Sequence, residues 1–285
     1  MKKKSFLILL TLIIVTSSFA QLKSPNASPR SNISQIIGLV SINLDYSRPS
    51  KKSREIFGGL VPYNKIWRTG ANNPTTISFS DYVKINNQLI SAGEYHLYSV
   101  PTESTLDLVI YEKTDAWGSL PTFDKSKVIA RVSSDFIDLP NTVETFTISF
   151  ENISNNGSTL NIMWDNKLAV YNIDALTKDK MINNINNVMN NNPSSNDYSR
   201  AAMYYFEEDI DIEKAMEWIN KAYKDSDNLR YWHLRYKALI YEKAGKLNKA
   251  LEYAESGYKR AIESKAVDGI NSCLLYTSPS PRDRG

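Results

Sequence analysis

The sequence predicts an α+β multidomain protein, in which an all-β domain of sandwich or barrel-like type precedes an α-helical repeat segment. Between residues 40 and 173 many short runs alternate apolar and polar side chains, as half-buried strands do, and turn-forming residues separate them. From about residue 175 the apolar period changes from two to about 3.6, which is the period of a helix. A chain of 285 residues is long enough for both parts.

The first 20 residues have the features of an export signal. A basic segment (residues 2–4) precedes an apolar run (6–15) that is too short to span a membrane, and small residues suited to cleavage follow at 18–20. We therefore expect a mature chain that begins near Gln21, in the periplasm or outside the cell, with no membrane span after cleavage. An uncleaved N-terminal anchor is the alternative.

The last residues differ from the helical chain that precedes them. Residues 273–283 (CLLYTSPSPRD) match the translation of a transposon adapter used in sequencing libraries, so we exclude the segment from Cys273 onward from the fold. We expect this tail to be disordered and the natural helical segment to continue beyond Ser272. A natural Ser/Pro-rich tail is the alternative.

These two segments dominate the charge and cysteine content of the chain. The formal charge is +3; the leader's three lysines and the tail's net charge of +1 account for four charges, which leaves −1. A nearly neutral chain lacks the basic surface that nucleic-acid binding requires. Cys273 is the one cysteine and there are two histidines, so we expect no disulfide framework, metal site or cofactor.

The β domain is expected over residues 21–174. Its strands are predicted at 40–44, 76–79, 83–85, 88–90, 94–100, 106–112, 127–132, 143–150, 159–164 and 167–173. Between the first two lies a long non-periodic stretch. Long irregular segments inside compact domains are uncommon and often functional, so any site should lie there.

That stretch carries a recognisable signature. It contains DYSRP at 45–49, RxIFGGLVPY at 54–63 and KxWRTGAN at 65–72, and AGxY follows at 92–95. In these motifs the chain resembles the DUF2911 family, an uncharacterised family of exported bacterial proteins. The resemblance covers about residues 24–173 and implies a β domain to which no activity is assigned.

The helical part begins with a polar helix (178–189) and an Asn/Ser/Pro linker, which together fill residues 175–196. Within residues 197–272 the segment 215–222 aligns with the segment 250–257, 35 positions later. This period is close to the tetratricopeptide (TPR) unit of about 34 residues, and the segment resembles two such units. The resemblance implies a protein or peptide partner. Small residues are expected where paired helices approach closely: Ala215, Ala222, Ala250 and Gly257.

The candidate ligand-binding residues are Asp45, Arg48, Trp67, Arg68 and Asn72. Two arginine side chains could hold an anion, because guanidinium groups match carboxylates and phosphates bidentately. In the alternative, which we favour, Asp45 pairs with an arginine, with Arg68 as the expected partner, and fixes the long loop to the sandwich beside a buried Trp67.

Two functions remain open. No nucleophile elbow, His-Glu-x-x-His helix, dinucleotide fingerprint or calcium loop is present, so we assign no catalytic residues. We expect a non-enzymatic envelope protein that binds a small anionic or glycan ligand. The alternative is a hydrolase in which Asp45 or Glu94 is the base and Arg48 and Arg68 hold the substrate. His96 shares a strand face with Glu94, where acid–base chemistry is possible, but an ordinary cross-strand histidine is favoured.

Overall fold

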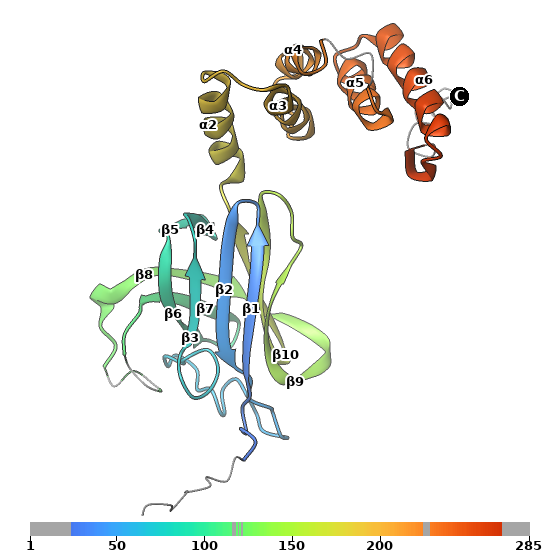
Figure 1. Ribbon diagram of the computed structural model, residues 1–285. Coiled ribbons are helices and arrows are strands. Elements are labelled where there is room, and N and C mark those ends of the chain that lie inside the picture. The colour runs from blue at the N-terminus through green and yellow to red at the C-terminus, as the bar shows by residue number, and fades with distance from the viewer. Residues whose placement is uncertain (1–23, 116–117, 119, 121, 225–228, 270–285) are drawn as a thin grey trace, which may run out of the picture. The chain divides into compact units, whose positions relative to one another are not determined.

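The computed structural model describes residues 24–115, 118, 120, 122–224 and 229–269. The chain divides into two compact units, Met1–Ala175 and Leu176–Gly285. The first is built of antiparallel strands and the second of helices, which confirms the α+β class (Figure 1). The expected export signal and the segment from Cys273 lie outside the described residues.

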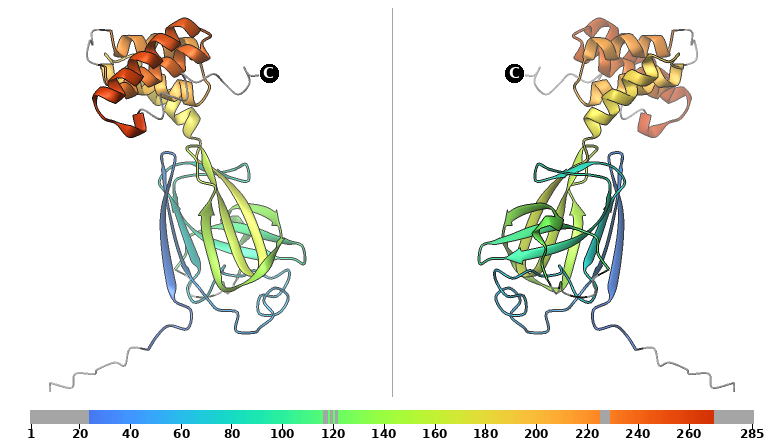
Figure 2. Two further views of the ribbon diagram at one scale, coloured as in Figure 1. Left: turned by 90° about the vertical axis from the view of Figure 1, so that its right-hand side faces the viewer. Right: turned by 90° about the vertical axis from the view of Figure 1, so that its left-hand side faces the viewer.

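The first unit is a sandwich of two antiparallel sheets (Figure 2). In spatial order the larger sheet contains β1 (Arg30–Ile37), β2 (Val40–Ser47), β3 (Thr75–Phe79), β6 (Gly93–Pro101), β7 (Thr105–Glu112) and β8 (Val128–Asp135). The smaller sheet contains β5 (Gln88–Ile90), β4 (Val83–Ile85), β10 (Gly157–Asp174) and β9 (Ile137–Glu151), and a 3₁₀ turn (Lys125–Lys127) precedes β8.

The period of two along β2 and β3 creates a buried inner face and a polar outer face. On β6 and β7 the outward side chains of Tyr98, Val109 and Tyr111 form a second apolar cluster. On β2 the side chains of Ile42 and Leu44 are buried, whereas Asn43 and Asp45 point the other way. The inward side chains of both sheets form one apolar cluster. Tyr46 also ties the sheets together, because its buried hydroxyl bonds to both the carbonyl oxygen and the amide nitrogen of Ile148 on β9, each at 3.1 Å.

Three features differ from the sequence-based expectation. Strand β9 begins at Ile137, six residues before the expected strand at 143–150. Strand β1 was not predicted, because its sequence RSNISQII is mostly polar; it is an edge strand that pairs with β2. The predicted strands 159–164 and 167–173 are one strand, β10. Asp165 and Asn166 look like a turn in the sequence, but they form an irregularity in the pairing with β9, where Asp165 has a φ of 56°.

The signature stretch is the long connection between β2 and β3, and short bridges hold it against the sandwich. Ser50 bridges to Thr145 on β9, and Trp67 bridges to Ser99 on β6. The backbones of Trp67 and Ser99 exchange two hydrogen bonds, of 2.8 and 2.7 Å. Although it lacks regular structure, this loop is therefore a fixed part of the unit.

The second unit contains α2 (Thr177–Met189), α3 (Ser195–Glu207), α4 (Ile212–Ala222), α5 (Tyr231–Lys243) and α6 (Leu247–Glu263). Helix α3 packs on α4 and α5 packs on α6, which gives two successive hairpins. The expected close-contact positions are all buried: Ala215 and Ala222 on α4, and Ala250 and Gly257 on α6. No helix in the described part of the chain has the length and apolar character needed to cross a membrane.

Candidate functional site

Trp67 is the residue that fixes the signature loop, although it is half-buried and not fully buried as expected. Its ring stacks on Trp164 of β10, with ring centres 5.9 Å apart and an interplanar angle of 18°, and meets the edge of Phe146 at 5.1 Å. Its Nε1 donates a hydrogen bond of 3.0 Å to the carbonyl oxygen of Gly70. The loop is therefore held by aromatic packing and backbone hydrogen bonds.

Asp45 has a different partner from the one expected. Its Oδ1 lies 2.5 Å from Nε of Arg30 on β1, and the two side chains are 38% and 40% exposed. Asp45 occupies an outward position between the buried Leu44 and Tyr46, so it faces away from the core. The expected pairing of Asp45 with Arg68 is therefore wrong.

Arg48 and Asn72 make contacts that hold the chain in place. Arg48 donates from Nε to the carbonyl oxygen of Phe146 at 3.1 Å and from Nη2 to Oγ1 of Thr147 at 2.8 Å. Asn72, whose φ is 58°, donates to the carbonyl oxygen of Ser28 at 3.3 Å and to Oγ of Ser47 at 3.4 Å. Asparagine tolerates this left-handed conformation better than most residues.

A first cleft, which we call the tryptophan cleft, lies where the signature loop meets the sandwich and has a volume of about 340 Å³. Its positive side chains are Lys52, Arg54 and Arg68, and burial lowers the pKa of Arg68. Among the described residues that line it, no side chain is acidic. The full lining is Ala27, Ser28, Pro49, Ser50, Lys52, Arg54, Leu60, Val61, Trp67, Arg68, Gly70, Ala71 and Trp164.

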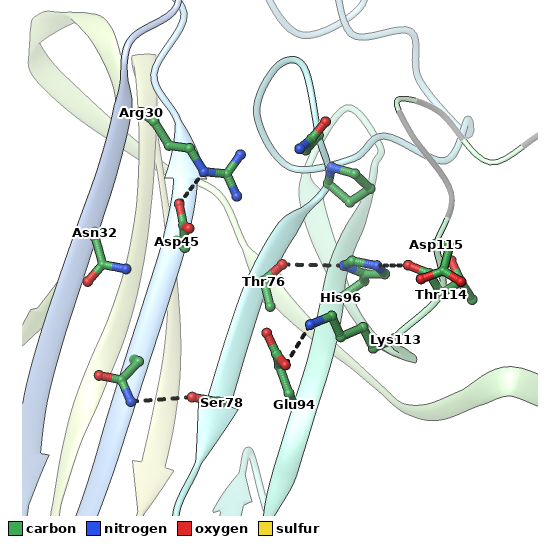
Figure 3. A pocket seen from close by; sticks show the side chains of 13 residues that line it. Arg30, Asn32, Asp45, Thr76, Ser78, Glu94, His96, Lys113, Thr114 and Asp115 are labelled. Atoms are coloured by element: carbon green, nitrogen blue, oxygen red, sulfur yellow. Dashed lines mark hydrogen bonds and ion pairs between the residues drawn. The ribbon is translucent and has the colours of Figure 1, made fainter.

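A second cleft, the outer groove, crosses the polar face of the larger sheet (Figure 3) and has a volume of about 440 Å³. Its lining is Arg30, Asn32, Asn43, Asp45, Asn73, Pro74, Thr76, Ser78, Glu94, His96, Lys113, Thr114 and Asp115. The Arg30–Asp45 pair lies at one side of the drawn groove, and Glu94 pairs with Lys113 at 2.6 Å on the other.

His96 is buried in the wall of the outer groove, with 5% of its surface exposed. Its Nε2 lies 2.9 Å from the carbonyl oxygen of Thr114, to which it must donate, and its Nδ1 lies 3.5 Å from Oγ1 of Thr76. Both ring nitrogens thus have protein partners. This geometry assigns His96 to holding the chain segment at Thr114 against the sheet.

The candidate residues do not come together in one site. Trp67 and Arg68 line the tryptophan cleft, whereas Asp45 and Glu94 line the outer groove. Arg48 and Asn72 line neither. Lys52 and Arg54 also line the tryptophan cleft but are not among the sequence-based candidates, although both lie in a basic run inside the signature. In the described part of the chain, no cluster of three or more histidine, cysteine or acidic residues could hold a metal ion.

The fold and its clefts define a β-sandwich domain whose signature loop is packed into the domain surface and which is followed by helical hairpins. A model of the family described as "Protein of unknown function (DUF2911)" matches residues 28–173, and the chain belongs to this family. No curated protein and no solved structure matches the chain.

The geometry predicts which charges are coupled. A double-mutant cycle for Arg30→Ala and Asp45→Ala, measured by urea unfolding, should give a coupling free energy of about 0.2–1 kcal/mol, as for other half-exposed ion pairs. The corresponding cycle for Asp45→Ala and Arg68→Ala should be additive within about 0.5 kcal/mol, because these residues line different clefts. Strong coupling between Asp45 and Arg68 would contradict the pairing described above.

Proposed function

We propose that the β-sandwich is a non-enzymatic binding module that holds a small anionic ligand in the tryptophan cleft. The observation that carries this proposal is the charge of the lining, which has three cationic side chains and no acidic one among the described residues. Guanidinium groups bind carboxylates and phosphates bidentately. The cleft volume of about 340 Å³ falls in the range of roughly 300–1,000 Å³ that small-molecule sites occupy.

The neighbouring charges support the same assignment. Lys51 pairs with Asp165 at 2.5 Å, so its charge is compensated outside the cleft. The carboxylate of Glu144 accepts a hydrogen bond from the backbone nitrogen of Lys52, at 3.0 Å, and does not line the cleft. The described lining therefore carries the cationic side chains of Lys52, Arg54 and Arg68 and no acidic one.

Burial of Arg68 favours an anionic occupant. Desolvation lowers the pKa of this side chain, which means that its charged form is less stable here than in water. A bound anion would offset that cost by Coulomb attraction. The indole rings of Trp67 and Trp164 supply an apolar wall, which suits a ligand that carries an anionic group on a flat apolar body.

The hydrolase alternative receives less support from this geometry. It requires Asp45 or Glu94 to act beside Arg48 and Arg68 on one substrate. Asp45 and Glu94 line the outer groove, Arg68 lines the tryptophan cleft, and Arg48 bonds to β9.

The anion proposal predicts a stabilisation that depends on Arg68. Titration of the protein with citrate or inorganic phosphate should raise its melting temperature, because a ligand that binds only the folded state adds about 2.7 kcal/mol at 100 times its Kd. The shift should shrink as sodium chloride is added, because salt screens exposed charges. Arg68→Gln should abolish the shift.

Arg131→Gln is the matched control, because Arg131 is a half-exposed arginine of the same unit that pairs with Asp107 away from the cleft. This variant should keep the full thermal shift. Equal shifts in both variants, or none in the native protein, would contradict the proposal.

We propose that the helical unit docks an acidic peptide. The repeat period supports a TPR-like role, because stacked repeats commonly bind peptides. A hollow of about 860 Å³ lies at its second hairpin. Among the described residues, its lining includes Arg230, Arg260 and Trp232, and Glu263 is the one acidic side chain. Its charge and its exposed indole ring suit a peptide that carries carboxylates and an apolar side chain.

Fluorescence anisotropy can test the peptide proposal. A labelled Glu/Leu-rich peptide should bind the full chain, and its Lys/Leu-rich counterpart should not. Arg230→Ala combined with Arg260→Ala should weaken binding, whereas Lys249→Ala, which removes an exposed lysine elsewhere on α6, should not. Equal binding of both peptides would rule out this recognition.

We propose that residues 1–20 direct export. The support is the basic, apolar and small-residue order of the leader. Expression in a Gram-negative host should place the protein in the periplasmic fraction, with Gln21 as the first residue by N-terminal sequencing. Retention in the cytoplasm with an intact leader would contradict export.

A further inference from the structure

We propose that the outer groove is a second and separate binding site, and that its ligand is a neutral polyhydroxylated molecule such as a saccharide. The groove lies on the face of the larger sheet that points away from the core, whereas the tryptophan cleft lies at the signature loop. Saccharide binding in the outer groove is therefore independent of anion binding in the tryptophan cleft.

Strand pairing generates the floor of the groove and, at His96, the start of one wall. Asn32, Asp45, Thr76 and His96 are register partners across β1, β2, β3 and β6, so their outward side chains form one row. In a second row, Asn43 is paired with Ser78, and Ser78 with Glu94. Because side chains two apart share a face, the two rows lie side by side and present polar groups across four strands.

Internal contacts fix the orientation of these groups. Arg30 holds Asp45, Lys113 holds Glu94, and Asn43 donates from Nδ2 to Oγ of Ser78 at 3.4 Å. Figure 3 shows these contacts together with the link from Thr76 through His96 to Thr114, which forms one wall. The groove is thus preorganised, which lowers the cost of binding.

The charge of the groove excludes strongly ionic ligands. Among the described residues, two cationic and three acidic side chains line it, and two of the acids are already paired. An anion would meet the carboxylates of Asp45, Glu94 and Asp115, and a cation would meet Arg30 and Lys113. These five side chains together give the lining a small net charge of −1.

The hydrogen-bonding groups suit hydroxyls. Carboxylates only accept hydrogen bonds, guanidinium and ammonium groups only donate, and side-chain amides do both. Hydroxyl groups also donate and accept, so adjacent hydroxyls on a sugar ring can satisfy such a mixed lining. Pro74 is the one apolar side chain among the described lining residues, so an apolar ligand would leave most of these groups unpaired.

Isothermal titration calorimetry on the full chain tests the proposal, with maltotriose, cellotriose, chitotriose and mannotriose as probes. At least one should bind saturably at millimolar concentration or below. Asp45→Asn and Asn32→Ala should each weaken that binding at least about tenfold, which corresponds to about 1.4 kcal/mol. Asn32 is exposed on β1, so its truncation should leave the fold intact.

Two control variants show whether the saccharide binds in the outer groove. Asp107→Asn removes an acid that is paired with Arg131 on the same sheet, outside the groove, and should leave saccharide binding unchanged. Arg68→Gln should also leave it unchanged, although that variant should lose the response to phosphate. The absence of saturable binding by all four saccharides would overturn the proposal, and so would equal binding by the native protein and both groove variants.

Discussion

The stacking of Trp67 on Trp164 is the contact on which the arrangement of the β-sandwich surface depends. Trp67 belongs to the loop between β2 and β3, and Trp164 belongs to β10 of the smaller sheet, so their contact joins the signature loop to the opposite layer. The paired backbone bonds between Trp67 and Ser99 add a link to β6. These contacts hold Arg68 at the wall of a cleft, although the loop has no regular structure of its own.

A second constraint is the alternation of side chains along the strands of the larger sheet. On β2 and β3 every other residue enters the core, so the remaining positions are free to carry polar groups. On β2 this places Ile42 and Leu44 inside and Asn43 and Asp45 outside. The clefts consequently have different chemistry. The tryptophan cleft is basic and partly aromatic because a loop builds most of it, and the outer groove is polar and nearly neutral because the outer face of a sheet forms its floor.

The sequence was sufficient for the fold class, most strands and the family, because alternation and the signature motifs are local properties. The sequence does not predict features that depend on residues that are distant in the chain but close in space. Strand β1 is an edge strand with a polar sequence, and an edge strand needs little apolar surface. Because β1 is not predicted from the sequence, Arg30 on that strand is not recognised as a neighbour of Asp45. The predicted partner of Asp45 is therefore wrong. Trp67 and Arg68 share a cleft and belong to one motif of the signature, whereas Lys52 and Arg54 reach the cleft through the path of the loop.

The two stacked indoles have a spectroscopic consequence. Their ring centres are 5.9 Å apart and their planes nearly parallel, so the electronic transitions of the two rings are close enough to couple. Near-ultraviolet circular dichroism depends on such fixed packing of aromatic side chains. One ring belongs to the loop and the other to the sheet. The circular dichroism signal of the pair therefore reports whether the loop is packed against the sheet. The protein thus carries its own reporter at the wall of the cleft.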